Sequence, residues 1–419
     1  MRTLAEWLEL HESVHAKSID LDLGRVGVVA DALGLRPLSY PVITVGGTNG
    51  KGSTVAHVSA LLAALGVRAG AFTSPHLVRY SERIRIAGHE ASDAELIAAF
   101  ERIEAARGAI TLTFFEYNTL AALVIFAAQR VDAAVLEVGL GGRLDATNLI
   151  DADVAVLCSV GLDHCDWLGD SLASIGAEKA GIFRSGRPAV LGSPDMPASV
   201  FAAIATIGAR PLIAERDFAW QIDNSDWSYR GVRDSYAHLP PSALPGSVQY
   251  RNAACAITAV AALGLAQALD ARVIAQALRA VRLAGRFQII PGAVEWTLDV
   301  AHNEPAARVL ARHLGERPCQ GRTYAVTGIL RDKDVAGIGR ALRQEIDRWI
   351  LCSLPGPRGS TAAELAERLG PDINARAERA DSASMGCELA RAQAQPADRV
   401  VVFGSFPMVG SALQWLGLY

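Results

Sequence analysis

Pro41-Val-Ile-Thr-Val-Gly-Gly-Thr-Asn-Gly-Lys-Gly-Ser-Thr54 is the stretch that decides the fold of this 419-residue chain. The pattern predicts a buried strand over residues 41–45, a loop over 46–52 and a helix over 53–65. A glycine-rich loop between a strand and a helix can wrap a polyphosphate, because its amides point inward and the helix N-terminus adds positive potential. Lys51 would then reach the outer phosphates. The alternative is a glycine-rich turn with a solvated lysine.

The loop departs from the common P-loop at the position of its metal ligand. That motif has Ser or Thr directly after the lysine, to ligate magnesium. Here Gly52 follows Lys51, and the first hydroxyl is that of Ser53. We therefore expect this loop to bind phosphate and the hydroxyl ligand of the metal to come from elsewhere.

The composition narrows the class of protein. The net charge of −4 and the pI of about 6.2 indicate no affinity for nucleic acid. The six cysteines include no Cys-x-x-Cys pair, which is typical of a reducing compartment without disulfides. The first ten residues read as an amphipathic helix rather than a signal peptide, and no apolar run is long enough to span a bilayer. We expect a soluble cytoplasmic protein that acts without nucleic acid or membrane.

Three further predicted strands in the first half end in polar side chains. The strands over 67–72, 131–137 and 153–160 end at or just before Ser74, Glu137 and His164. Open α/β sheets place their chemistry at the carboxyl ends of strands. A carboxylate such as Glu137 beside a P-loop can hold magnesium, although it can also merely cap a turn. His164 has Asp163 and Asp166 beside it and reads equally as a ligand or catalytic residue or as a structural histidine.

Lys179 stands in Glu178-Lys-Ala-Gly-Ile182, close in sequence to these strand ends. An ammonium near magnesium would be repelled unless a phosphate paired with it, or unless carbamylation turned the amine into an anion that binds metal. The alternative is an ordinary surface lysine. A zinc site from Glu137, His164 and Cys165 is disfavoured, because adjacent residues cannot easily converge on one tetrahedral ion.

The remaining pattern predicts two α/β domains. Helices are expected over 92–107, with Ser92 and Glu95 as caps, and over 118–130, whereas 195–250 shows no readable pattern. Strands and helices alternate again beyond residue 284, which predicts a second, smaller parallel sheet. The expected fold is a P-loop-containing, mostly parallel-sheet N-terminal domain, 1–284, and a Rossmann-like C-terminal α/β domain, 285–419. Residue chemistry alone leaves phosphoryl transfer and ATP-driven ligation open.

A resemblance to a known family covers nearly the whole chain. The strings that carry it are Thr48-Asn-Gly-Lys-Gly-Ser53, Thr73-Ser-Pro-His-Leu77, Tyr80-Ser-Glu-Arg83, Leu136-Glu-Val-Gly-Leu-Gly-Gly-Arg-Leu-Asp-Ala-Thr-Asn148, Asp163-His-Cys-Asp-Trp-Leu-Gly169, Glu178-Lys-Ala-Gly-Ile182, Asp299-Val-Ala-His-Asn303 and Asp332-Lys-Asp334. In order and content they resemble the bifunctional dihydrofolate synthase/folylpolyglutamate synthase family of the Mur ligase superfamily.

The resemblance implies an ATP-dependent ligase that joins L-glutamate to 7,8-dihydropteroate and to the γ-carboxyl of folylpolyglutamates through an acyl phosphate. It implies two Mg²⁺ ions, allows a monovalent cation such as K⁺, and agrees with a monomer. A monofunctional folylpolyglutamate synthase and a Mur-type peptidoglycan ligase are the alternatives within the superfamily. A non-catalytic nucleotide-binding switch is the alternative outside it.

The resemblance also implies roles for individual residues. Catalytic roles fall to Lys51, Lys179 and His302. The metal ligands are Ser74, Glu137, His164 and a carbamylated Lys179. The ATP contacts are Thr48, Asn49, Gly50, Lys51, Asn252, Arg286 and Asp299. The pterin contacts are Ser18, Ile19, Asp20, Leu21, Thr113, Phe114, Phe115, Glu116, Leu144, Asp145 and Ala146, and glutamate lies near His302 and Ser405.

The chain departs from the family pattern at two places. Glu304 intervenes before Pro305, and Pro407-Met408 follows Gly404-Ser-Phe406 where a polar residue and threonine are common. Both departures lie on the glutamate side, so they concern the amino-acid contacts and leave the ligase chemistry unaffected.

Overall fold

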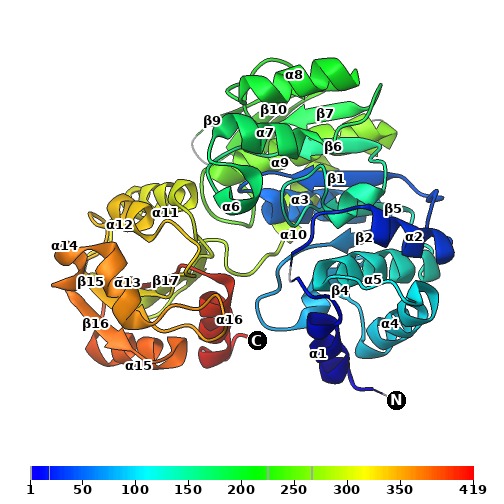
Figure 1. Ribbon diagram of the computed structural model, residues 1–419. Helices are drawn as coiled ribbons and strands as arrows, with labels where there is room; N and C mark the ends of the chain where they lie inside the picture. Colours follow the sequence, from blue (N-terminus) through cyan, green and yellow to red (C-terminus); the bar gives the residue numbers. More distant parts are fainter. Residues whose placement is uncertain (1, 18, 224–225, 266–267) are drawn as a thin grey trace. The chain divides into compact units, whose positions relative to one another are not determined.

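The computed structural model describes residues 2–17, 19–223, 226–265 and 268–419, which form two compact units (Figure 1). The first unit consists of Met1–Gly161, Cys165–Ala243 and Tyr250–Val281. The second consists of Leu162–His164, Leu244–Gln249 and Arg282–Tyr419. The motif around His164 is thus divided between the units.

The first unit is built on an eight-stranded sheet in the order β4-β3-β2-β5-β1-β6-β7-β8. The strands from β2 to β8 in this order are parallel, and β3 and β4 continue the sheet in antiparallel pairing. The bounds are β1 Val42–Gly46, β2 Ala69–Phe72, β3 Ile84–Ile86, β4 His89–Glu90, β5 Ala133–Glu137, β6 Val154–Leu157, β7 Pro188–Leu191 and β8 Arg210–Ile213.

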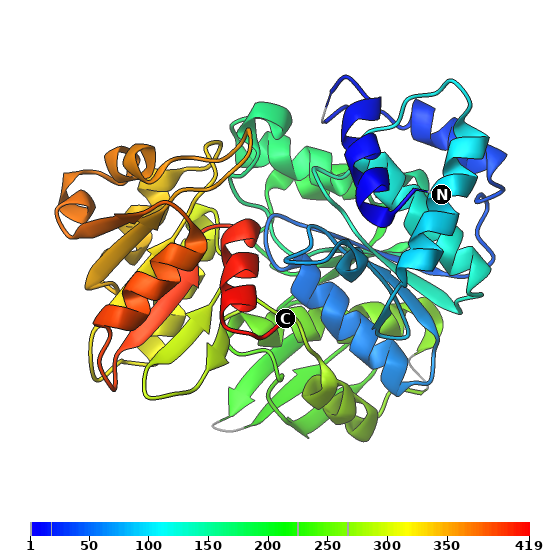
Figure 2. The same cartoon turned by 90° about the horizontal axis from the view of Figure 1, so that it is seen from below.

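Helices cover both faces of this sheet, as the continuous apolar sequence of its strands requires (Figures 1 and 2). Every residue of β1 is buried, with Val42 in one hydrophobic cluster and Ile43 in another. The helices are α1 Leu4–Val14, α2 Gly24–Ala32, α3 Lys51–Ala64, η1 Tyr80–Arg83, α4 Asp93–Arg107, α5 Phe114–Ala128, η2 Ala146–Leu149, α6 Cys165–Leu168, α7 Leu172–Ala180, α8 Ala198–Ile207, α9 Val248–Val260, η3 Ala261–Leu265 and α10 Ala271–Ala280.

Two predicted helix starts are wrong, and local geometry explains both. Helix α3 begins at Lys51 rather than at residue 53, because the left-handed backbone of Gly50 (φ 89°) ends the loop there. Helix α5 begins at Phe114 rather than at residue 118, because Thr113 and Glu116 form a capping box. The predicted capping of α4 by Ser92 is confirmed.

The stretch without a readable pattern contains regular structure. Beyond α8 and β8 lies an antiparallel sheet in the order β11-β10-β9, with bounds β9 Ala219–Asp223, β10 Asp226–Arg230 and β11 Ser235–Leu239. Trp227 and Tyr229 of β10 are buried in the cluster that also holds residues of α3 and α9. These short strands are polar on one side, which explains why a loop-rich composition concealed them.

The second unit carries a six-stranded sheet in the order β12-β13-β17-β14-β15-β16, parallel except for β12 at its edge. Its strands are β12 Gln288–Ile290, β13 Glu295–Leu298, β14 Thr323–Thr327, β15 Arg348–Cys352, β16 Ala377–Ala380 and β17 Arg399–Phe403. Its helices are α11 Glu304–Glu316, α12 Val335–Leu342, α13 Ala362–Leu369, α14 Pro371–Asn374, α15 Ala383–Gln393 and α16 Phe406–Trp415. The predicted α/β fold with two largely parallel sheets is confirmed.

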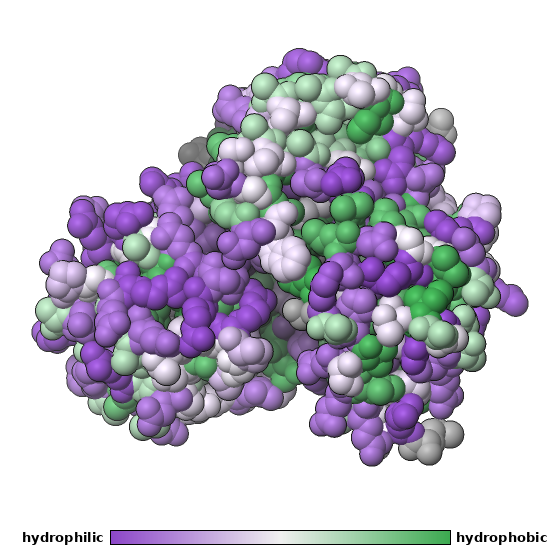
Figure 3. All heavy atoms as spheres, viewed as in Figure 1, coloured by the Kyte–Doolittle hydropathy of each residue, from purple (hydrophilic) through white to green (hydrophobic). Residues whose placement is uncertain are grey.

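Hydrophilic residues dominate much of the face shown in Figure 3, with smaller groups of hydrophobic residues between them. Among the described residues, no helix combines the length and apolarity that crossing a bilayer would need.

Candidate active site

The glycine-rich loop between β1 and α3 is a tight cradle. Gly47 and Gly50 have φ angles of 146° and 89°, in the region that favours glycine. A Cβ on Gly47 would lie 3.1 Å from Cys158 Cβ, and one on Gly50 would lie 3.0 Å from Asn252 Oδ1. Both glycines are therefore needed for conformation and for space. The predicted ATP contact Asn252, from α9, lies directly against the loop.

The segment that follows β6 braces this loop. The Thr48 amide donates to Ser159 O at 2.9 Å, and Thr48 Oγ1 donates to Gly161 O at 3.1 Å. The Asn49 amide donates to Ser159 Oγ at 3.0 Å. Thr48 and Asn49, both predicted ATP contacts, thus hold the backbone of the loop in one shape.

Two lysines meet at one carbonyl oxygen of the loop. Lys51 Nζ donates to Gly47 O at 2.9 Å and to Thr48 O at 3.2 Å. Lys179 Nζ, from α7, donates to the same Gly47 O at 3.2 Å, and Lys179 is 5% exposed. The two lysines thus share one carbonyl partner, and the burial of Lys179 shows that its interpretation as a surface lysine is wrong.

Ser74 and Glu137 meet at the carboxyl ends of two neighbouring strands. Strands β2 and β5 are parallel, with Phe72 in register with Leu136. The Ser74 amide donates to Glu137 Oε2 at 3.2 Å, and Glu137 is 4% exposed. The structure thus brings together the two predicted metal ligands that sequence order separates by 63 residues.

The donors at these strand ends suit Mg²⁺. A hydroxyl and a carboxylate are hard oxygen ligands, and Mg²⁺ usually takes one or two carboxylates and completes its shell with waters and substrate phosphates. Within the described ranges, no three His, Cys, Asp or Glu side chains cluster as a ready metal cage. Ser74 and Glu137 beside a phosphate loop therefore fit a magnesium ion that arrives with its nucleotide.

Arg83 is a buried cation that the site prediction omitted. Its Nε donates to His76 Nδ1 at 2.8 Å, and its guanidinium carbon lies 5.5 Å from the centre of the Phe114 ring. Burial lowers the pKa of Arg83, while the charge of Glu137 is among the opposing influences. Burial, followed by the charge of Arg83, lowers the pKa of His76 to about 4. The signal available was the string Tyr80-Ser-Glu-Arg83, directly after a strand end.

In the second unit, Asp163 is the centre of a polar cluster. Its Oδ1 is 2.6 Å from Lys333 Nζ, and its Oδ2 accepts from Asn303 Nδ2 at 2.8 Å and lies 3.6 Å from His302 Nε2. Burial would raise the pKa of Asp163, but the His302 bond and the charges of Lys333 and His164 hold it well below its usual range. The His164 amide also donates to Asp163 Oδ1 at 2.9 Å.

The predicted metal ligands are therefore described in two sets. Ser74, Glu137 and Lys179 lie in the first unit, and His164 lies in the second. His164 has a φ of 52°, a conformation uncommon for a residue with a Cβ. Its side chain is 31% exposed, so its ring remains accessible to a ligand.

Asp299 and Arg286 are neighbours at the start of the second unit. The two oxygens of Asp299 accept from the amides of Phe287 and Ala301, each at 2.8 Å. Burial raises the pKa of Asp299, and the charge of Arg286 opposes that shift. The guanidinium carbon of Arg286 lies 5.2 Å from the centre of the Phe406 ring. These two predicted ATP contacts thus share one polar edge of the sheet.

His302 and Ser405, the predicted glutamate contacts, are both fixed by backbone. His302 Nδ1 donates to Val300 O at 2.8 Å, and its Nε2 lies 3.6 Å from Asp163 Oδ2. Ser405 is 2% exposed and caps α16 by accepting from the Met408 amide at 3.3 Å.

The two departures from the family pattern fall in first helical turns. Glu304 begins α11 and pairs with Arg308, while Asn303 still caps the helix. Pro407 lies in the first turn of α16, where the lack of an amide costs nothing. Both helix starts are therefore intact.

The predicted pterin segments are neighbours within the first unit, although Ser18 lies outside the described residues. Glu116 Oε1 accepts from Arg25 Nη2 at 3.1 Å, and Arg25 Nη1 is 3.0 Å from Asp20 Oδ2. Phe115 packs over Gly139, since a Cβ there would lie 2.5 Å from the ring. Ile19, Leu21, Phe114 and Leu144 remain partly exposed around these contacts.

Asp145 is committed to its own loop. Its Oδ2 accepts from the amides of Gly139 and Leu140 at 3.0 and 2.8 Å, and its Oδ1 accepts from the amide and hydroxyl of Thr147 at 3.0 and 2.6 Å. Four donors occupy about the four lone-pair positions of a carboxylate. The carboxylate of Asp145 therefore shapes the backbone that presents Leu144 and Ala146.

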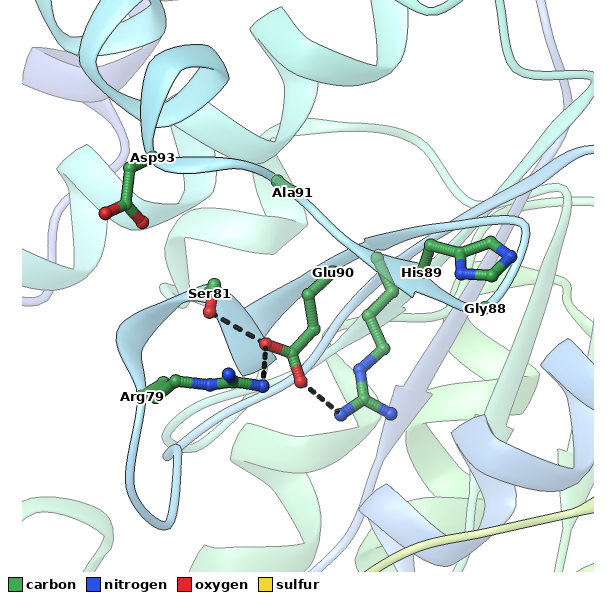
Figure 4. Close-up of a pocket in the computed structure, with 8 residues that line it drawn as sticks. Arg79, Ser81, Gly88, His89, Glu90, Ala91 and Asp93 are labelled. Atoms are coloured by element: carbon green, nitrogen blue, oxygen red, sulfur yellow. Dashed lines mark hydrogen bonds and ion pairs between the residues drawn. The ribbon is translucent and has the colours of Figure 1, made fainter. Parts of the chain in front are cut away.

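A shallow pocket of about 630 Å³ in the first unit contains none of the predicted site residues (Figure 4). Its cations are already paired: Arg79 and Arg85 lie 3.1 and 3.2 Å from the two oxygens of Glu90, to which Ser81 also donates. It is thus a surface salt-bridge network and offers no unbalanced charge to an anion.

Two family models match the chain. The Mur ligase middle domain matches residues 45–260, and the Mur ligase glutamate ligase domain matches residues 285–406. Fold and site therefore define a Mur-type ligase, an enzyme that forms an amide bond at the expense of ATP.

Proteins similar to this chain have names that specify the reaction more narrowly than the two domain models do. The dihydrofolate synthase/folylpolyglutamate synthase of Escherichia coli (strain K12) is 44% identical over 98% of this chain and 95% of its own length. The structure of E. coli FolC in complex with DHPP and ADP matches with a TM-score of 0.94 and 42% identity, over 99% of this chain and 98% of that chain. A bifunctional folylpolyglutamate synthase/dihydrofolate synthase with Mn, AMPPNP and L-glutamate bound matches with a TM-score of 0.92 and 42% identity, over 100% and 99% of the two chains.

The chain belongs to the dihydrofolate synthase/folylpolyglutamate synthase family. The predicted resemblance is confirmed, and so are the classes of ligase and of ATP-binding enzyme. The peptidoglycan ligase and the non-catalytic switch are set aside by the same matches.

Proposed function

We propose that this protein joins L-glutamate to 7,8-dihydropteroate, giving dihydrofolate, and also to the γ-carboxyl of folylpolyglutamates. The observation that carries the proposal is the cradle at residues 46–51, with Lys51 and Lys179 on one carbonyl and Glu137 beside Ser74. The 44% identity to a relative named for both activities supports the pair of substrates.

ATP binds in this proposal along the glycine loop. Gly50 presents its backbone to the phosphates, and Lys51 neutralises the transferring group. Thr48 and Asn49, whose amides donate to Ser159, hold the loop in shape around the phosphates. Asn252, Arg286 and Asp299 complete the nucleotide contacts.

Two Mg²⁺ ions bind at Ser74, Glu137, His164 and a carbamylated Lys179. When bound, they supply positive charge that shields the phosphate oxygens. Lys179 acquires the carbamate when its amine nitrogen bonds to the carbon of CO₂ and a proton is released. A monovalent cation such as K⁺ is a further requirement to be measured.

The pterin end of the substrate contacts Ser18 to Leu21, Thr113 to Glu116 and Leu144 to Ala146. Asp20 is the carboxylate that remains partly exposed, with 25% of its side chain accessible, whereas Glu116 is 4% exposed. We assign Asp20 to a polar contact with the pterin, and Glu116 and Asp145 to shaping the site.

The reaction then has two steps that balance. A carboxylate oxygen of the substrate attacks the γ-phosphorus of ATP, the bond to the β-γ bridging oxygen breaks, and ADP leaves. The amine nitrogen of glutamate then attacks the acyl carbon, and the carbon–oxygen bond to phosphate breaks. His302, with Nε2 3.6 Å from Asp163 Oδ2, takes the proton that the amine gives up, and Ser405 lies on the glutamate side.

We assign the binding of ATP and pterin to a domain of residues 1–284, and the glutamate side of the site to a domain of residues 285–419. The scattered, reduced cysteines support a cytoplasmic protein. We propose that it acts as a monomer.

The test is ADP release with dihydropteroate or tetrahydrofolate, each with and without glutamate. The proposal predicts glutamate-dependent release with both. Release with tetrahydrofolate alone would reduce the protein to a folylpolyglutamate synthase. Release that ignores the acceptor would overturn ligation.

A further inference from the structure

Arg25, on the first turn of α2, joins the loop before α2 to the first turn of α5. Its Nη2 donates to Asp20 O and to Glu116 Oε1, each at 3.1 Å. Its Nη1 lies 3.0 Å from Asp20 Oδ2 and 3.3 Å from Asp22 Oδ2. One guanidinium thus fixes a backbone carbonyl, the side chain of the loop and a residue 91 positions away in sequence.

Glu116 connects Arg25 to the residues at the start of α5. Its Oε2 accepts from the Thr113 amide at 2.6 Å, while its Oε1 accepts from Arg25. The side chain of Glu116 is 4% exposed and that of Arg25 is 22% exposed. A pair this well shielded from water holds its geometry better than a surface salt bridge does.

Asp20 is oriented from a second direction. His15 Nε2 lies 3.1 Å from Asp20 Oδ2, and His15 Nδ1 lies 2.8 Å from Thr111 Oγ1. The bond from His15 and the charge of Arg25 lower the pKa of Asp20, which keeps the carboxylate charged at neutral pH. Two donors therefore hold Oδ2, and Oδ1 turns toward the exposed Lys17 at 3.5 Å.

We propose that Arg25 is a positioning residue for the pterin end of the substrate. By tying residues 19–22 to Thr113 and Glu116, it holds two of the proposed pterin-contact segments at a fixed separation before substrate arrives. Preorganisation of this kind lowers the ordering cost of binding. The inference rests on the proposed function and adds a residue to which that function assigns no role.

The test compares Arg25→Lys and Arg25→Met with the control Arg36→Met. Arg36 also lies by α2, but within the described residues its bonds are to Asp31 and to Gly27 O rather than to the proposed substrate segments. Arg25→Met is expected to raise KM for dihydropteroate by about 10- to 100-fold, because a misplacement near 1 Å can cost about 10²-fold. Arg25→Lys keeps the charge and loses the planar guanidinium, so its KM for dihydropteroate is expected to lie between those of the wild type and Arg25→Met.

Other readouts separate positioning from a general loss of structure. KM for ATP and the melting temperature of Arg25→Lys should stay close to wild type, and Arg36→Met should leave both KM values unchanged. An unchanged KM for dihydropteroate in both Arg25 variants would overturn the inference, as would an equal rise in KM for ATP. If the wild type released no ADP with dihydropteroate, the proposed function itself would fail, and Arg25 would lose its assigned substrate.

Discussion

Replacing Lys179 by alanine tests the most unusual feature of the phosphate cradle. Lys51 Nζ and Lys179 Nζ lie 2.9 and 3.2 Å from the same Gly47 oxygen, so the two nitrogens are at most about 6 Å apart. Two positive charges at about 6 Å repel by about 3 kcal/mol at an effective dielectric constant of about 20, and a carbamate on Lys179 would turn this into an attraction of similar size. Losing about 3 kcal/mol from the transition state corresponds to about a 10²-fold fall in rate.

We therefore expect Lys179→Ala to lower kcat/KM for ATP-dependent ligation by about 10²-fold or more. Acetate or propionate should restore part of the rate, because a small acid can occupy the space left by the side chain and replace the carbamate. Lys51→Ala is the matched control, since it loses a cation at the same oxygen and should not be rescued by an acid. Unchanged kinetics in Lys179→Ala, or equal rescue of both variants, would refute the carbamate.

Three further predictions concern charge at buried positions. Glu137→Gln removes the charge of the carboxylate beside Ser74 and should raise the Mg²⁺ concentration for half-maximal activity at least tenfold; an unchanged titration would contradict its role as a ligand. Lys333→Met leaves Asp163 buried without its cation and should cost about 3–5 kcal/mol in stability by thermal unfolding, with a smaller loss when Asp163→Asn is added; additive losses would contradict the pairing. Burial lowers the pKa of His57 to about 4. The neutral ring therefore contributes fully to the free energy of unfolding above about pH 6.5, and this free energy falls by about 1.4 kcal/mol per pH unit as the pH drops toward 4. In urea unfolding, His57→Gln should flatten this slope, and an unchanged slope would exclude His57 as its source.

The phosphate cradle could be predicted from the sequence because its signal is local. Glycines between a strand and a helix fix the loop, and neighbouring parallel strands bring Ser74 and Glu137 to one edge. The capping of α4 by Ser92 was also predicted from the local sequence.

The polar cluster around Asp163 could not be predicted in the same way. Lys333 lies 170 residues away in sequence, and no periodic pattern links it to Asp163. Both residues lie in strings that carry the family resemblance, but only the fold makes them a pair. Likewise, the use of Asp145 by its own loop amides follows from backbone geometry and not from residue type.

The helix starts that were missed show how turn chemistry outweighs apolar periodicity. Thr113 and Glu116 have the spacing of a capping box, which predicts the true start of α5 better than its apolar residues do. The small sheet of β9 to β11 was concealed because short strands with one polar side share the composition of loops.

Transfer of ¹⁸O from the substrate to phosphate tests the central claim most directly. Dihydropteroate labelled with ¹⁸O in its carboxylate is incubated with ATP, L-glutamate and Mg²⁺, and the inorganic phosphate is analysed by mass. Activation as an acyl phosphate predicts one ¹⁸O atom in each phosphate released, together with one ADP per dihydrofolate. Unlabelled phosphate alongside normal product formation would contradict the account.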